Sequence, residues 1–147
     1  MNQYVRNSMG YKESFVIGVD FDGTVVGHSW PNIGKDIGAV PVLKKIVENG
    51  HRIMIWTLRG NAPIHGRDTL AEAVKWYADN DIPVWGINEN PAQKASGWTN
   101  SNKQEADIFI DDVALGCPLK YDSKISNKPF VDWVKVEEML IEKKIIS

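Results

Sequence analysis

The 147 residues of the chain are 43% hydrophobic and 24% charged, with a mean hydropathy of −0.29. These values are close to the averages of globular proteins, so disordered, collagen-like and membrane-embedded classes are excluded, and the length suits a single domain over residues 1–147. Lys and Arg total 17 against 19 Asp and Glu, which gives a net charge of −2. Because this balance provides no overall basic surface, long nucleic acid is not an expected partner.

Cysteine content and apolar runs bear on where the protein works. Cys117 is the single cysteine of the sequence, so no internal disulfide or cysteine metal cluster can form, and this fits a reducing environment. The apolar run at residues 15–19 is too short for a signal peptide or a membrane-spanning helix. We therefore predict a cytoplasmic protein without a membrane partner, with a flexible N-terminal extension at residues 1–13.

The first half of the chain alternates between strand and helix patterns. A β-branched apolar run at residues 15–19 predicts a buried strand. Apolar residues then recur at helical spacing from residue 40 to 49, where Pro41 suits the first turn and Gly50 the position after the helix end. A second strand is predicted at residues 52–56, directly before Thr57.

The second half continues this alternation. The segment from Thr69 to Glu72 has a capping-box pattern, which predicts the start of a helix that ends near Asn80. A third strand is predicted at residues 84–87. Residues 88–102 lack apolar periodicity and are therefore predicted to form a long loop. A fourth strand at residues 106–110 and a closing helix at 129–146 complete the chain.

This order of elements indicates an α/β fold. Strands that alternate with helices form a parallel sheet through right-handed crossovers, with helices on both faces. Ligands bind such sheets beyond the carboxyl ends of the strands. The polar residues that follow three of the predicted strands are Asp20 and Asp22, Thr57, and Asp111 and Asp112. We therefore expect these five side chains to meet at one edge of the sheet.

The acidic residues in this set predict a metal site. Asp20 and Asp22 are two positions apart, so in an extended chain their side chains project to the same side, and Gly23 permits an immediate turn. With Asp111 and Asp112 they would repel one another unless a cation neutralises them or protons are retained. Carboxylate oxygens favour Mg²⁺. For the Asp-x-Asp-Gly segment taken alone, a plain turn after a strand is the alternative.

Four segments in the same order resemble the motifs of the haloacid dehalogenase-like (HAD) superfamily of phosphohydrolases. The segment from Asp20 to Thr24, Asp-Phe-Asp-Gly-Thr, is similar to the first motif, and Thr57 is similar to the Ser or Thr that ends the next strand. Lys103 is the best match to the family's lysine, with Lys94 as a rival. The pair at residues 111–112 is similar to the acidic fourth motif, so the resemblance covers residues 15–112.

The resemblance implies a three-layer, Rossmann-like fold and a metal-assisted mechanism. Asp20 would be the nucleophile that forms an aspartyl-phosphate, and Asp22 would be the general acid and base. Mg²⁺ would be held by the Asp20 carboxylate, the Asp22 backbone carbonyl and Asp112, with Asp111 as a further ligand or an outer partner.

Three residues are expected to bind the phosphoryl group. In the resembled family Thr57 would donate its hydroxyl to a phosphoryl oxygen, and Lys103 would neutralise the transferring group and orient Asp20. Arg59 could add a bidentate phosphate contact. Without a phosphate-binding role, Thr57 would simply end a strand, Lys103 would be a solvated loop lysine and Arg59 would be a surface arginine.

The loops between the motifs are too short for a cap domain, so the resemblance is to small capless phosphatases of bacteria and phages. We predict a Mg²⁺-dependent phosphomonoesterase that acts on a small phosphorylated substrate such as a nucleotide. Trp30 and Trp98 could stack a nucleobase or simply pack over the core. A phosphotransferase, a polynucleotide-end phosphatase and a catalytically silent phosphate-binding module are the alternatives, and the sequence leaves the oligomeric state open.

Overall fold

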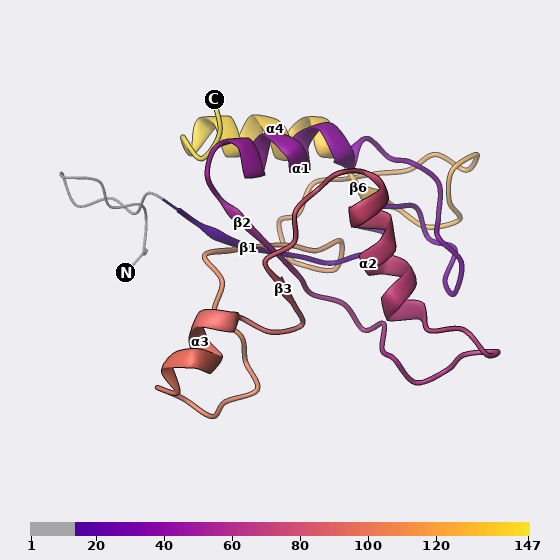
Figure 1. Ribbon diagram of the computed structural model, residues 1–147. Helices are drawn as coiled ribbons and strands as arrows, with labels where there is room; N and C mark the ends of the chain where they lie inside the picture. Colours follow the sequence, from indigo (N-terminus) through magenta and orange to yellow (C-terminus); the bar gives the residue numbers. More distant parts are fainter. Residues whose placement is uncertain (1–13) are drawn as a thin grey trace.

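Four parallel strands form the central sheet, in the order β3-β2-β1-β4 (Figure 1). The computed structural model describes residues 14–147, so the predicted extension at residues 1–13 lies outside the described residues. The strands of the sheet are β1 (Val16–Val19), β2 (Arg52–Ile55), β3 (Gly86–Ile87) and β4 (Ile108–Ile110). A separate antiparallel pair consists of β5 (Leu119–Lys120) and β6 (Phe130–Val131).

Helices flank the sheet, which confirms the predicted α/β class with a parallel sheet. They are α1 (Ala39–Glu48), α2 (Thr69–Asp79), α3 (Pro91–Ser96) and α4 (Trp133–Glu142). Helices α1 and α4 are in contact and lie together at the top of Figure 1. Within residues 14–147, no helix is long and apolar enough to cross a membrane.

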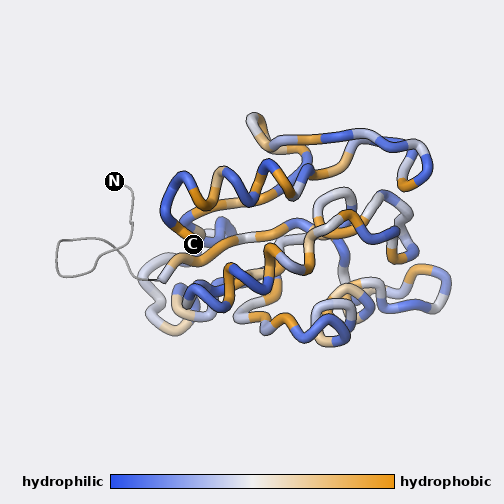
Figure 2. The backbone as a smooth tube through the Cα atoms, turned by 90° about the horizontal axis from the view of Figure 1, so that it is seen from above, coloured by the Kyte–Doolittle hydropathy of each residue, from blue (hydrophilic) through white to orange (hydrophobic). Residues whose placement is uncertain are grey.

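The core consists of apolar side chains from the sheet and from the inner faces of the helices. Ile17 and Val19 of β1 and Ile53 and Ile55 of β2 have no exposed surface, as expected for strands that are covered on both faces. Leu43 of α1 packs into the same cluster. Figure 2 shows hydrophobic and hydrophilic residues alternating along the helices, and α1, α2 and α4 each bury apolar side chains in the core. Each such side chain, when fully buried, stabilises the fold by about 1.5–3 kcal/mol.

The predicted loop at residues 88–102 is partly helical. The Asn90 side chain accepts a hydrogen bond from the Gln93 backbone N–H, Pro91 occupies the first turn, and Gly97 ends the helix with a φ of 63°. An Asn-Pro start and a Gly end are recognisable helix signals. Six residues are too few to show an apolar period, and the helix was therefore missed.

The start of α2 differs from the prediction in its cap. The Asp68 side chain, one residue ahead of Thr69, accepts the Ala71 backbone N–H at 2.9 Å. Glu72 forms an ion pair with Arg67, so the expected capping box does not form.

The closing helix is shorter than predicted. Residues 130–131 pair with β5 as a strand, and the Asp132 side chain caps the helix by accepting the Lys135 backbone N–H. Helix α4 therefore begins at Trp133 rather than at residue 129, and it ends at Glu142. The third strand is shorter than predicted as well, since only Gly86–Ile87 pairs with β2.

Candidate active site

The register of the sheet brings the ends of β1 and β4 together. Val19 pairs with Ile110, and the backbone N–H of Asp20 donates to the Ile110 carbonyl at 3.0 Å. Asp20 and Asp111 are therefore the next residues of two neighbouring strands, and Asp112 follows directly. This is the meeting of strand ends that the sequence predicts.

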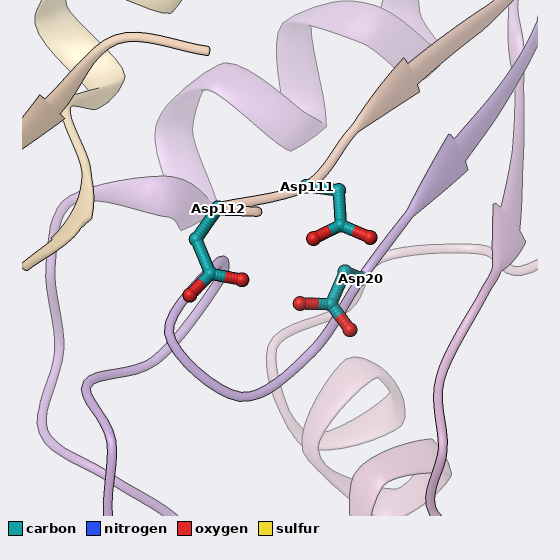
Figure 3. A group of neighbouring side chains, drawn as sticks. All are labelled: Asp20, Asp111 and Asp112. Carbon is teal, nitrogen blue, oxygen red and sulfur yellow. The ribbon is translucent and has the colours of Figure 1, made fainter. Parts of the chain in front are cut away.

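Asp20, Asp111 and Asp112 form an acidic cluster. Each offers a carboxylate oxygen, and these atoms all lie within 4.8 Å of one another. Figure 3 shows the three side chains converging from the ends of β1 and β4. The buried Thr24 ties the cluster together, because its hydroxyl donates to Asp20 Oδ2 at 2.7 Å and accepts the Asp112 backbone N–H at 3.1 Å. This role of Thr24 was not predicted from the sequence, although its place in the turn after Gly23 was the available signal.

Burial and mutual repulsion perturb the carboxyl groups of the cluster. Burial raises the pKa of Asp20 from 3.8 to about 7, the hydrogen bond from Thr24 opposes this shift, and the charge of Asp111 adds to it. The pKa of Asp111 is also raised, mainly by burial and further by Asp112. Without a metal, the folded chain therefore holds these carboxyl groups close together against their mutual repulsion. A bound cation would reduce this repulsion.

His28 stands beside the cluster. Its Nε2 lies 2.9 Å from the Pro129 carbonyl and 3.3 Å from Asp112 Oδ2. Gly23 has a φ of 77°, and a Cβ atom there would lie 2.2 Å from the His28 ring and 2.7 Å from Asp112 Oδ2. Only glycine permits this close approach. The position of His28 could not be predicted from the sequence, because the contact depends on how residues 24–37 fold back over the strand ends.

Asp22 does not join the acidic cluster through its side chain. Arg59 Nε and Nη2 donate to its two carboxylate oxygens at 2.9 and 2.7 Å. The other guanidinium N–H groups donate to the backbone carbonyls of Pro31, Asn32 and Thr69. All five N–H donors of this buried arginine are thus engaged. The expected phosphate contact of Arg59 is therefore not available in this arrangement. Any metal contact from Asp22 would have to come from its backbone carbonyl.

Thr57 lies where the sequence predicts, beyond the end of β2 and in the wall of the same pocket. Its backbone N–H donates to Asn88 Oδ1 at 2.8 Å, and its hydroxyl oxygen accepts the Arg59 backbone N–H at 3.1 Å. The hydroxyl hydrogen is left for an acceptor in the pocket. Asn88 is a pocket residue that the sequence analysis missed. Its φ of 52° is a conformation that Asn tolerates well, and the register of β3 was needed to place it.

Neither candidate lysine is among the side chains that line the pocket. Lys103 is exposed in the segment between α3 and β4, and Lys94 Nζ lies 3.4 Å from a Glu89 carboxylate oxygen. The structure therefore does not bring Lys103 to the predicted site. Motif order places a lysine along the chain, but it does not determine where a long exposed side chain reaches.

The two tryptophans considered for base stacking are separated by the fold. Trp30 lines the pocket and is 53% exposed. Trp98 is 67% exposed and is not part of the pocket lining. Only Trp30 is placed to contact a bound molecule.

The pocket at the strand ends has a volume of about 780 Å³. Its lining residues are Asp20, Asp22, His28, Trp30, Trp56, Thr57, Leu58, Arg59, Asn88, Asp111, Asp112 and Val113. Apart from His28, the one basic side chain in this lining is Arg59, whose donors are already engaged. A cation held by these carboxylates would reduce their repulsion of an entering anion.

The residues present fit a hard divalent cation. Asp20, Asp111 and Asp112 supply oxygen atoms only, within a space small enough to share one ion. Burial and the charge of Asp111 raise the pKa of Asp20, and a cation bound beside it would favour the ionised carboxylate. No cysteine is among the pocket-lining residues, which disfavours softer metals.

Comparison with known proteins gives one informative match. No protein-family model matches the chain, and no curated protein matches it. A solved structure described as that of the conserved protein coded by a locus of Bacteroides thetaiotaomicron is 32% identical in sequence, with a TM-score of 0.68. The match covers 88% of this chain and 92% of that chain. The chain therefore belongs to the same protein family as this conserved protein of Bacteroides thetaiotaomicron.

Proposed function

We propose that the protein is a Mg²⁺-dependent phosphomonoesterase of the capless HAD type, with a three-layer Rossmann-like fold, that works in the cytoplasm on small phosphate esters. The observation that supports this most strongly is the convergence of Asp20, Asp111 and Asp112 at the floor of an open pocket beside Thr57. The acidic residues and Thr57 belong to the four segments whose sequence resembles that superfamily.

Each residue then has a definite task. Asp20 would attack phosphorus, and Thr24 would hold its carboxylate through the 2.7 Å hydrogen bond. Asp111 and Asp112 would help to hold the ion. When bound, Mg²⁺ would reduce the repulsion between the anionic nucleophile and the anionic phosphate. Thr57 would donate its free hydroxyl hydrogen to a phosphoryl oxygen.

Asp22 remains the candidate for the proton transfer. It lines the pocket two residues from the nucleophile, and both of its carboxylate oxygens are bound by Arg59. To act as general acid, Asp22 would exchange one of these hydrogen bonds for the leaving oxygen. Arg59 would act as a positioning residue that keeps the carboxyl group at the pocket wall.

A second candidate is a module that binds a metal and phosphate without turnover. It is favoured by the position of Lys103 outside the pocket lining and by the engagement of Asp22 with Arg59. The resemblance assigns catalytic roles to both residues, but Lys103 does not line the pocket and the Asp22 carboxylate is bound by Arg59.

Phosphate release from an aryl phosphate separates the two candidates. We expect release with Mg²⁺, none with EDTA, and a loss of at least about a thousandfold in Asp20→Asn, because no nucleophile remains. Asp79→Asn, an exposed carboxylate on α2 paired with Lys75, is the matched control and should retain full activity. If the protein binds Mg²⁺ and phosphate but shows no turnover, the silent module is correct. Equal turnover in Asp20→Asn and the parent would exclude the proposed mechanism.

A further inference from the structure

The pocket has an apolar rim directly beside its acidic floor. The rim consists of Leu58, Val113 and Trp30, all of which line the pocket. Leu58 and Val113 are 105% and 84% exposed, so neither contributes to the core, and Trp30 is 53% exposed. Large apolar side chains that face solvent around a pocket are typical of a binding surface.

The positions of these residues along the chain set the rim next to the reacting centre. Leu58 directly follows Thr57, and Val113 directly follows Asp112. A group attached to a phosphate held at the strand ends would leave the pocket between them. The first contacts of the alcohol part of a substrate would therefore be with hydrocarbon and with the Trp30 ring.

The charge of the pocket restricts the ligand further. Asp20, Asp22, Asp111 and Asp112 all line it, and the N–H donors of Arg59 are all engaged. A second phosphate or a carboxylate on the ligand would face these carboxylates, and the remaining basic side chain, His28, already lies against Asp112 and the Pro129 carbonyl. Leu58 and Val113 offer no hydrogen-bonding group to sugar hydroxyls, which would lose water contacts without replacement.

We propose that the pocket selects phosphate esters whose alcohol part is aromatic or aliphatic and uncharged, in preference to sugar phosphates and to ligands with a second anionic group. This inference rests on the proposed function for the position of the phosphate. Leu58 and Val113 are specificity residues in this account. They take no part in the chemistry.

Affinity for phosphonates tests the selection without requiring turnover. Calorimetry would compare phenylphosphonate with methylphosphonate in the presence of Mg²⁺. We expect the phenyl compound to bind the parent protein at least about fivefold more tightly, because its ring is removed from water at the rim. Val113→Thr and Leu58→Asn should each reduce this ratio to below about two. Val134→Thr, the same change at a 65% exposed valine on α4, should leave the ratio unchanged.

The outcomes separate this inference from the proposed function. Equal affinities for the two phosphonates, no binding of either, or a ratio that survives both rim substitutions would overturn the inference. In turnover assays, phenyl phosphate should exceed glucose 6-phosphate in kcat/KM by about tenfold in the parent, a preference lost in Val113→Thr. If neither ester is hydrolysed while the phosphonate ratio holds, the phosphatase proposal fails and the apolar selection stands.

Discussion

Arg59 links three parts of the chain that the sequence alone does not connect. Its guanidinium binds the Asp22 carboxylate, the carbonyls of residues 31 and 32 in the segment after β1, and the carbonyl of Thr69 at the start of α2. A buried charge of this kind is stable only when its partners are complete. The residue therefore positions Asp22 and closes one wall of the pocket.

Arg59→Met should lower the free energy of unfolding by about 3–5 kcal/mol, because it leaves the Asp22 carboxylate without its partner and removes one donor from each of three backbone carbonyls. Arg52→Met is the matched control. Arg52 is exposed and lies over the Trp85 ring at 5.0 Å, so its loss should cost less than about 1 kcal/mol. Chemical denaturation measures both values. A cost below about 1 kcal/mol for Arg59→Met would show that the pair carries little of the stability.

The raised pKa of Asp20 makes the stability of the metal-free protein depend on pH. Between 3.8 and about 7, the folded chain keeps the Asp20 proton while the unfolded chain has lost it. Folding takes up a proton in this window, so stability falls as pH rises through it and levels off above about 7. Denaturation in EDTA should therefore show a larger fall in the parent than in Asp20→Asn, where the raised pKa of Asp111 still contributes. Parallel pH profiles for the two proteins would contradict the raised pKa.

At the scale of the elements, the strands were the most predictable part of the fold. Residues 15–19 and 53–55 are apolar because strands in a covered parallel sheet are buried on both faces, and the polar residues that follow these strands marked the site. The acidic cluster could therefore be predicted from strand ends alone. The contacts of Thr24, His28 and Arg59 could not, because they depend on loops that bring distant residues together.

Gly23→Ala tests how the turn after β1 shapes the cluster. Gly23 and Gly38 have φ of 77° and 87°, so alanine is strained at both, but a Cβ would meet other atoms only at Gly23. We expect both variants to lose about 1 kcal/mol of stability from backbone strain, with a further loss at Gly23 from the clash. Only Gly23→Ala should weaken Mg²⁺ binding, by at least about tenfold, because it displaces Asp112.

Calorimetric titration with Mg²⁺ measures this difference. Equal Mg²⁺ affinity in Gly23→Ala and Gly38→Ala would mean that the approach of His28 and Asp112 to the turn does not shape the metal site.

The net charge of the whole molecule is close to zero, but its acidic side chains are unevenly distributed. The net charge is −2, yet four carboxylates line one pocket whose single arginine is fully engaged. A ligand that binds only the folded state stabilises it, by about 2.7 kcal/mol at one hundred times its dissociation constant. The proposed cation would therefore stabilise the folded chain by reducing the repulsion between these carboxylates.

The central claim is that Asp20 is phosphorylated during turnover, and chemical trapping tests it most directly. The protein would be mixed with an aryl phosphate and Mg²⁺, quenched in acid and reduced with borohydride, which converts an aspartyl-phosphate to homoserine. Mass spectrometry of the peptides would then locate the change. We predict homoserine at position 20 when Mg²⁺ is present and none with EDTA or in Asp20→Asn. Phosphate release without a change at position 20, or with the change at Asp22, Asp111 or Asp112, would contradict the account.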